Sequence, residues 1–337
     1  MSAVIQMRHL RKEYRGLVAI RDLSLDLQRG DVFGFIGPNG AGKTTTIKML
    51  ATLLAPTGGT AYVDGIDVVR EPEAVRAVIG YMPDTFGVYD DFRVWEYLDF
   101  FAAAYRIPPA RRPRAVDEVL ELTDLRVKKQ SYVESLSRGM KQRLCLARTL
   151  IHDPKVLLLD EPASGLDPRA RIEFKELMRE LRAMGKTIIV SSHILPELAD
   201  FCNKIGVIEK GELLVAGDVG EIMRQVAGQH TLEVRVAPED PVEVPTLAVR
   251  ADGASAVARA APAAAVEQAV ATLRMIEEIG EVRATDGVIR AIYTGPRGGE
   301  WRVLHDLVAR GVRVLAFGTE PTDLEDVFMR TTRNIVA

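Results

Sequence analysis

The chain has 337 residues, a length that corresponds to about two domains. Its 44 basic and 47 acidic residues give a formal net charge of −3, so no basic excess indicates a nucleic-acid-binding surface. Two cysteines cannot build a disulfide framework, and no uninterrupted apolar run reaches the roughly 18 residues of a membrane-spanning helix. The polar start, residues 1–15, does not resemble a secretory signal. These features favour a folded cytoplasmic protein.

Short apolar runs alternate with helical patterns through the first two-thirds of the chain. The predicted strands are residues 31–36, 155–160 and 187–191, and the predicted helices between them are residues 43–54 and 168–184. Because these runs are apolar throughout rather than alternating, they suit strands that are covered on both faces. Residues 93–125 show helical patterns only and predict a helical insertion. The order of elements predicts an α/β domain with a largely parallel sheet.

A glycine-rich loop follows the strand predicted at residues 31–36. Residues 37–44 match G-x-x-x-x-G-K-[ST], in the strand-to-helix context that this phosphate-binding motif requires. Glycines let successive N–H groups turn toward an anion, and the helix start adds partial positive charge. Lys43 supplies a charge for the β- and γ-phosphates, and Thr44 is placed to bind Mg²⁺. The predicted nucleotide-binding residues of this loop are Gly37, Pro38, Asn39, Gly40, Ala41, Gly42, Lys43, Thr44 and Thr45.

Two acids stand at the end of the strand predicted at residues 155–160. Asp160 ends the apolar run, and Glu161 follows it, directly before Pro162. We expect Asp160 to hold Mg²⁺ through water, and Glu161 to face the γ-phosphate and polarise the attacking water. The alternative is a polar pair that merely ends the strand.

The C-terminal third differs in composition from the rest. The last lysine is Lys210, and 12 of the 24 residues in the segment 248–271 are alanine. This segment is typical of a loop that leads into a helix, or of a linker. The change in composition predicts a domain boundary near residues 220–230.

The predicted elements of the C-terminal third alternate between strands and helices. They are strand 230–236, helix 264–278, strands 280–285 and 287–294, helix 299–310, strand 312–317 and a short helix at 323–330. The pair Asp286-Gly287 is a plausible hairpin turn between two of the strands. The order β-α-β-β-α-β is that of a ferredoxin-like domain.

Three further motifs resemble those of ATP-binding-cassette (ABC) proteins. Residues 136–143 resemble the signature motif of that family, residues 165–167 its D-loop, and residues 191–193 its switch histidine. Tyr14 stands where the family stacks an aromatic ring on adenine, although an ordinary exposed tyrosine is the alternative. Together with the phosphate loop and the two acids, these motifs follow the order and spacing of the family over residues 1–220.

The resemblance implies that two cassettes pair head to tail, with each ATP between one phosphate loop and the other signature motif. Ser137 and the N–H of Gly139 would then contact the γ-phosphate on the opposite subunit. His193 would contact the γ-phosphate and orient the attacking water, and would act with Lys43 and Glu161 as a catalytic residue. Asp167 would lie at the interface of the pair, and can also cap the helix that follows it.

Two positions depart from the common family pattern. The signature motif has Arg138 and Met140 where the family usually has glycine and glutamine, while the contacting residues Ser137 and Gly139 are kept. The loop at residues 80–84 has Asp84 where the family commonly has a glutamine that reaches Mg²⁺. An aspartate is shorter, donates no hydrogen bond when ionised and adds negative charge. We therefore expect a weaker or remodelled Mg²⁺ contact at Asp84, through a water molecule.

A second resemblance lies at residues 321–329. They are similar to the closing motif of ATPase subunits that serve ABC exporters with type-2 permeases, which carry out drug, lipid, polysaccharide or ion efflux. The alternative is an amphipathic terminal helix, because Leu324, Val327 and Phe328 are spaced i, i+3, i+4 and would pack on a sheet.

The sequence therefore predicts an α/β P-loop NTPase of the ABC type with a second, smaller domain. The expected domains are an ABC ATPase domain at residues 1–222, with a helical subdomain at about 88–150, and an α+β ferredoxin-like accessory domain at 228–337. The expected function is the ATP-hydrolysing subunit of an ABC exporter, with ATP and Mg²⁺ as cofactors. Its expected partners are a paired cassette and a separate type-2 permease, which would place it peripherally on the inner face of the cell membrane.

Two other functions remain as alternatives. One is the ATPase of an ABC importer, which the cassette motifs alone do not distinguish. The other is an ABC protein that acts on nucleic acid or ribosomes. Only one phosphate loop is present, and 94 residues separate Lys43 from Ser137, too few for a long coiled-coil insertion. With the near-neutral charge, this argues against a nucleic-acid partner.

Overall fold

The computed structural model describes residues 3–85, 87–194, 198, 200–222, 230–237, 263–285, 287–296 and 298–320. They form two compact units, one that ends at Gly220 and one that begins at Glu221. In neither unit do the described residues include a helix with the length and apolar character needed to cross a membrane. The closing motif at 321–329, the helix predicted at 323–330, Asp286 and most of the alanine-rich segment lie outside the described residues.

A ten-stranded mixed sheet runs through the first unit, in the order β5-β4-β1-β2-β10-β9-β3-β8-β7-β6. The strands are β1 (Ile5–Tyr14), β2 (Leu17–Leu27), β3 (Val32–Ile36), β4 (Gly58–Val63), β5 (Ile66–Asp67), β6 (Ile79–Met82), β7 (Val156–Leu159), β8 (Thr187–Ser192), β9 (Lys204–Glu209) and β10 (Glu212–Asp218). Pairing is parallel from β9 through β3, β8 and β7 to β6. It is antiparallel among β1, β2, β4 and β5. The predicted parallel sheet is therefore one half of a larger mixed sheet.

The parallel half confirms the predicted buried strands. Every residue of β3, β7 and β8 is buried, as expected for apolar runs that are covered on both faces. The antiparallel half was not predicted, and β1 shows why. Its register against β2 shifts between Met7 and Leu10, so that two residues of β1 lie opposite one residue of β2. This irregularity interrupts the period-two alternation by which such a strand is recognised in a sequence.

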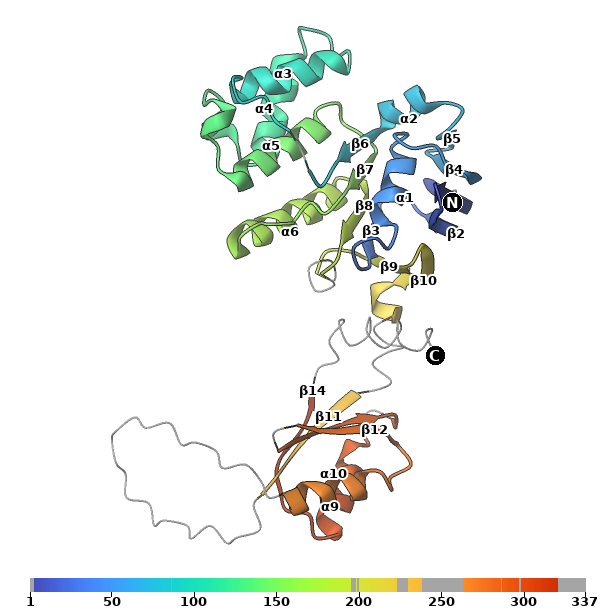
Figure 1. Cartoon of the computed structure of the whole chain (residues 1–337). Helices are drawn as coiled ribbons and strands as arrows, with labels where there is room; N and C mark the ends of the chain where they lie inside the picture. Colours follow the sequence, from blue (N-terminus) through green and yellow to red (C-terminus); the bar gives the residue numbers. More distant parts are fainter. Residues whose placement is uncertain are drawn as a thin grey trace, which may run out of the picture. The chain divides into compact units, whose positions relative to one another are not determined.

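The helices of the first unit fall into two groups. Three helices follow strands of the sheet: α1 (Lys43–Leu50), α2 (Pro72–Val78) and α6 (Pro168–Ala183). Three others contact one another and form a helical layer (Figure 1): α3 (Val94–Ala104), α4 (Arg112–Leu122) and α5 (Arg138–Leu150). Short 3-10 turns at Arg126–Lys128 and Val133–Ser135 belong to this layer. The helix predicted at 43–54 ends at Leu50, because Thr52 takes a left-handed φ of 62°.

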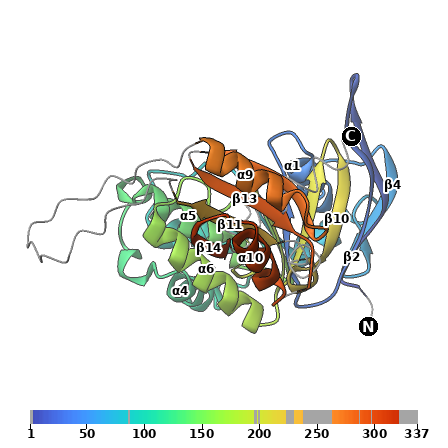
Figure 2. The same cartoon turned by 90° about the horizontal axis from the view of Figure 1, so that it is seen from below.

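The second unit is a four-stranded antiparallel sheet with two helices. Its elements are β11 (His230–Val236), α9 (Ala263–Leu273), β12 (Ile279–Thr285), β13 (Val288–Tyr293), α10 (Glu300–Ala309) and β14 (Val314–Glu320). The strand order is β12-β13-β11-β14, and both helices lie on the same face of the sheet (Figure 1, Figure 2). Leu232, Val234 and Leu307 are among its fully buried residues. The described elements follow the predicted β-α-β-β-α-β order, and the ferredoxin-like assignment stays a prediction.

Candidate nucleotide site

The phosphate loop lies between β3 and α1 and is held closely against neighbouring strands. A Cβ atom on Gly37 would lie 2.2 Å from the backbone oxygen of Ile208 in β9. Gly42 has a φ of 113°, and a Cβ atom there would lie 2.4 Å from Cδ1 of Ile20 in β2. No other residue fits at either position without moving these strands. The two outer glycines of the motif are therefore required by packing as well as by phosphate approach.

The start of α1 offers free backbone donors. Gly42 caps this helix without a side-chain hydrogen bond, and its first turn contains no acidic residue. The first N–H groups of a helix lack acceptors within the helix, and they carry partial positive charge. The loop therefore presents an uncompensated anion-binding end toward the site.

Lys43 is almost completely buried, with 5% of its surface exposed. Its Nζ donates to the backbone oxygens of Gly37 and Pro38, at 2.7 and 3.3 Å. The same Nζ lies 3.2 Å from Oε1 of Glu161, an ion pair without hydrogen-bond geometry. The cation is thus folded back over the loop and already faces the acid predicted to activate water.

Asp160 is linked to the loop by hydroxyl groups. Its Oδ1 accepts hydrogen bonds from Ser191 at 2.7 Å and from Thr44 at 3.0 Å. Burial raises the pKa of Asp160; the two hydroxyl donations lower it, and the charges of Asp84 and Glu161 raise it again, so that the net direction is upward. The ionised form of Asp160 is therefore costly in the absence of a cation.

These oxygen donors fit a Mg²⁺ ion. Thr44 and Asp160 are adjacent, and Asp84 lines the same cavity. Mg²⁺ prefers oxygen ligands and is usually held by one or two carboxylates together with water and substrate phosphates, not by a complete protein cage. No group of three or more His, Cys, Asp or Glu side chains in the described residues forms such a cage. The raised pKa of Asp160 marks the place where a cation would relieve unfavourable charge.

Glu161 is held from three sides. Its backbone N–H donates to Oγ of Ser191 at 2.9 Å, and its Oε2 lies 2.9 Å from Nδ1 of His193. Lys43 faces its other carboxylate oxygen. The φ of Glu161 is 49°, a left-handed conformation that is unfavourable for a residue with a side chain and that often occurs at functional sites. The position of this carboxylate is therefore set by its contacts.

One cavity of about 500 Å³ brings many of the predicted residues together. It is lined by Tyr14, Asp84, Glu161 and all of the predicted loop residues except Gly37. Tyr14 is 44% exposed, and Nζ of Lys12 lies 5.3 Å from its ring centroid. Asp160 and His193 do not line the cavity, but each contacts a residue that does: Asp160 contacts Thr44, and His193 contacts Glu161. Their assigned roles remain predictions, and the geometry makes them possible.

Three residues at or beside the cavity were missed by the sequence reasoning. Arg21 and Lys210 line it, and they come from β2 and from the turn between β9 and β10. Neither belongs to a motif, and only the sheet order brings these segments next to the loop. Ser191 was noted beside His193, but its bridge between Asp160 and Glu161 was not expected. The available signal was its place at the end of a buried strand parallel to β7.

Ser137, Gly139 and Asp167 are not among the residues that line this cavity. Ser137 caps α5 and accepts a hydrogen bond from the N–H of Met140 at 3.3 Å. Asp167 caps α6 and accepts from the N–H of Ala170 at 2.8 Å. The capping role considered for Asp167 is thus present. Contact of these residues with a nucleotide needs a second cassette and stays a prediction.

Comparison with known proteins gives consistent similarities. The family profile described as ABC transporter matches residues 20–164. Nod factor export ATP-binding protein I of Cupriavidus metallidurans is 37% identical over 234 residues, which cover 69% of this chain and 77% of that protein. Probable multidrug ABC transporter ATP-binding protein YbhF of Escherichia coli (strain K12) is 40% identical over 232 residues, which cover 68% of this chain and 40% of that protein.

A solved structure described as the ATP binding subunit of an ABC transporter is also similar. It has a TM-score of 0.60 and 30% sequence identity, and the match covers 66% of this chain and 93% of that one. Similarity in sequence and in structure therefore extends over about two-thirds of the chain.

Proposed function

This chain belongs to the family of ABC transporter ATP-binding subunits, which hydrolyse ATP, and we propose that it powers export through a separate permease. The named relatives support export over import, because their names refer to Nod factor export and to multidrug transport. The motif at residues 321–329, similar to that of exporter ATPases with type-2 permeases, supports the same direction. In this proposal the chain acts at the inner face of the membrane through its permease.

Different residues of the cavity would bind different parts of ATP and its metal ion. The loop N–H groups and Lys43 bind the β- and γ-phosphates, and Tyr14 stacks on the adenine. Thr44 and Asp160 would hold Mg²⁺, with Asp84 acting through water. When bound, Mg²⁺ would neutralise phosphate charge. Two cassettes then close head to tail, so that Ser137 and Gly139 of each chain reach the nucleotide of the other.

The observation that carries the catalytic proposal is the fixed position of Glu161. Lys43 and His193 each hold one oxygen of its carboxylate, and Ser191 holds its backbone. A carboxylate held in this way can accept a proton from a water molecule that attacks the γ-phosphate. His193 can orient that carboxylate because its Nδ1 lies 2.9 Å from Oε2 of Glu161. Hydrolysis would then reopen the pair.

The permease would bind beside the Asp84 loop, at an aromatic cluster of the helical layer. Tyr97 is fully buried, whereas Phe100 and Tyr89 are 48% and 54% exposed, with ring centroids 5.9 Å apart. Arg148 supports the cluster, because it donates to the hydroxyl of Tyr97 at 3.1 Å and lies 5.1 Å from the ring of Phe101. The buried rings form core, and the exposed rings offer an apolar contact surface.

Co-purification from membranes tests this proposal. A tagged chain expressed in its source cells should bring one polytopic membrane protein through detergent extraction. Phe100→Asp should abolish the co-purification and leave ATPase activity within about twofold, since surface substitutions rarely change stability much. Leu53→Asp is the matched control, because Leu53 is also an exposed apolar residue, at 58%. Capture of the same membrane protein by wild type and by Phe100→Asp would contradict the assigned surface.

A further inference from the structure

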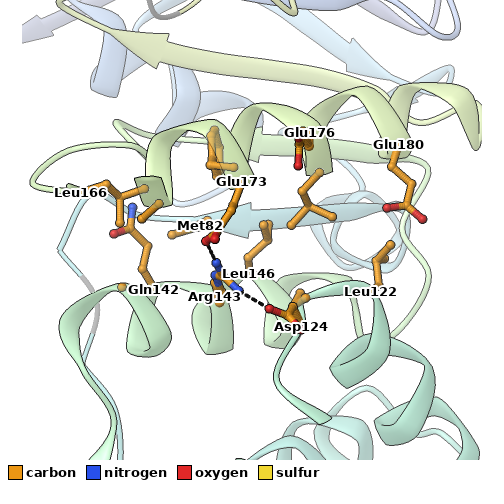
Figure 3. Close-up of a pocket in the computed structure, with 15 residues that line it drawn as sticks. Met82, Leu122, Asp124, Gln142, Arg143, Leu146, Leu166, Glu173, Glu176 and Glu180 are labelled. Atoms are coloured by element: carbon orange, nitrogen blue, oxygen red, sulfur yellow. Dashed lines mark hydrogen bonds and ion pairs between the residues drawn. The ribbon is translucent and has the colours of Figure 1, made fainter. Parts of the chain in front are cut away.

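A second cavity lies between α5 and α6 in the first unit (Figure 3). Its volume is about 280 Å³, and none of its lining residues lines the nucleotide cavity. Its apolar walls are formed mainly by Leu122, Leu146, Leu166, Phe174 and Leu177. Ligand sites in proteins are typically concave and apolar with a few well-placed polar groups. This cavity has the walls of such a site, so its polar groups decide what it can bind.

Gln142 provides a polar group that faces the cavity. Only 5% of its surface is exposed, and within the described part of the chain its side-chain amide makes no hydrogen bond. Figure 3 shows the amide reaching from α5 into the cavity, close to Leu166. A polar group bound in the cavity could pair with this amide, whereas an apolar occupant would remove it from water without a partner.

Carboxylates line the opposite wall. Glu173, Glu176 and Glu180 follow one face of α6 beside the cavity (Figure 3). Arg143 already pairs with Glu173, and also with Asp124 at 3.0 Å. Glu176 and Glu180 are exposed to solvent, and they have no ion-pair or hydrogen-bond partner among the described side chains. The cavity therefore contains one cation against four carboxylates, with two of the carboxylates unneutralised.

We propose that this cavity is a binding site for a small amphiphilic cation. Its apolar body would lie between α5 and α6, its ammonium group would face Glu176 and Glu180, and a hydroxyl or carbonyl group at its other end would pair with Gln142. Anions are disfavoured by the excess of carboxylates, and a purely apolar molecule would leave Gln142 unsatisfied. The site adjoins Gly139 of the signature motif and Leu166 of the D-loop, both of which line it.

Tyramine is a suitable probe, because it joins an aromatic body to an ammonium group at one end and a phenol hydroxyl at the other. Binding to the full-length, nucleotide-free chain is measured by calorimetry, so the result does not depend on ATP hydrolysis. Tyrosol, which has a hydroxyl in place of the ammonium group, should bind about tenfold more weakly. Phenethylamine, which lacks the phenol hydroxyl, should bind several-fold more weakly.

Variants locate the binding. The double substitution Glu176→Gln with Glu180→Gln should weaken tyramine about tenfold and leave tyrosol unchanged. Gln142→Met, which keeps the side-chain length, should weaken tyramine and leave phenethylamine unchanged. Glu134→Gln, an exposed glutamate elsewhere in the helical layer, is the control. Thermal unfolding of each variant verifies the fold. Absence of tyramine binding at millimolar concentration, or equal binding by wild type and the double variant, would overturn the proposal.

Discussion

The nucleotide cavity and the α5–α6 cavity lie in the same unit but satisfy their polar groups in opposite ways. In the nucleotide cavity, Lys43, Glu161 and His193 hold one another, and Ser191 ties Glu161 to Asp160. In the α5–α6 cavity, Gln142 and two carboxylates lack described partners. A closed charge network keeps reacting groups in place before substrate binds. Polar groups that face a cavity without a protein partner can instead pair with a ligand, so the two cavities should respond differently to substitution.

The largest effect should follow from removing the buried cation of the network. Lys43→Ala leaves Glu161 without its counter-charge and the phosphates without a cation, so ATP hydrolysis should fall by more than about 100-fold. Lys48→Ala is the matched control, because Lys48 is exposed on the same helix. Phosphate release and nucleotide-binding assays measure both variants. Near-normal hydrolysis by Lys43→Ala would show that the charge network of the nucleotide cavity has no catalytic role, and would contradict the contrast drawn between the two cavities.

His193 should affect turnover more than binding. It contacts Glu161 but does not line the cavity. His193→Ala should therefore lower kcat by roughly 10- to 100-fold and change KM for ATP little. His9→Ala, which alters an exposed histidine paired with Asp22, serves as the control. A large rise in KM at constant kcat would show that His193 binds nucleotide instead of positioning the base.

Asp84 should have a smaller effect. Its carboxylate lines the cavity, and its charge is one of the contributions that raise the pKa of Asp160. Asp84→Gln loses that charge, but its longer side chain, common in the family, would reach Mg²⁺ directly instead of through a water molecule. Half-maximal activity should then need several-fold less Mg²⁺, as shown by hydrolysis assays over a Mg²⁺ titration. Unchanged Mg²⁺ dependence together with an unchanged rate would refute the remodelled metal contact.

His152, a partly buried histidine outside both cavities, has one buried ring nitrogen without a hydrogen-bond partner. Nε2 of His152 lies 2.8 Å from the backbone oxygen of Ile79, its ring stacks on Tyr105 at 3.7 Å, and its Nδ1 is buried without a partner. Burial is the main cause that lowers the pKa of His152; its contact with Ile79 and the charge of Asp153 raise it, and Lys186 lowers it. The histidine therefore protonates more readily in the unfolded chain.

The sign of the pH effect follows from this difference. As pH falls below the unfolded pKa of about 6.5, the unfolded chain binds more protons, so the free energy of unfolding decreases. The slope is at most about 1.4 kcal/mol per pH unit for one histidine. His152→Gln should flatten the pH dependence of Tm between pH 7 and pH 5, compared with wild type in the same buffers. Equal slopes would show that His152 is not the titrating group.

The parts of the site that could be predicted are those whose residues are contiguous. The phosphate loop from Gly37 to Thr44 and the pair Asp160-Glu161 each occupy one short segment after a buried strand, so periodicity and residue type identify them together. The family resemblance identified His193, although it predicted contact with the γ-phosphate and not with Glu161. In contrast, Lys210 reaches the cavity only because β10 and β9 lie between β2 and β3 in the sheet. Such proximity has no local signal.

The fold shows the same division. The uniformly buried strands β3, β7 and β8 were predicted, because their apolar runs are unbroken. The strand β1 was missed, because its register shift disturbs the alternation. The α5–α6 cavity could not be predicted at all. Gln142 belongs to the signature helix, where its spacing suggests only a polar residue, and its burial depends on packing against α6.

The central claim is that Glu161 activates water in a nucleotide sandwich formed by two chains. Sedimentation velocity of Glu161→Gln with Mg²⁺-ATP tests it most directly, with wild type and the double variant Glu161→Gln with Ser137→Arg as comparisons. We expect Glu161→Gln to hydrolyse ATP at least about 100-fold more slowly. It should sediment as a stable dimer with ATP, and the double variant should stay monomeric. Rapid hydrolysis by Glu161→Gln, or a monomer at saturating ATP, would contradict the account.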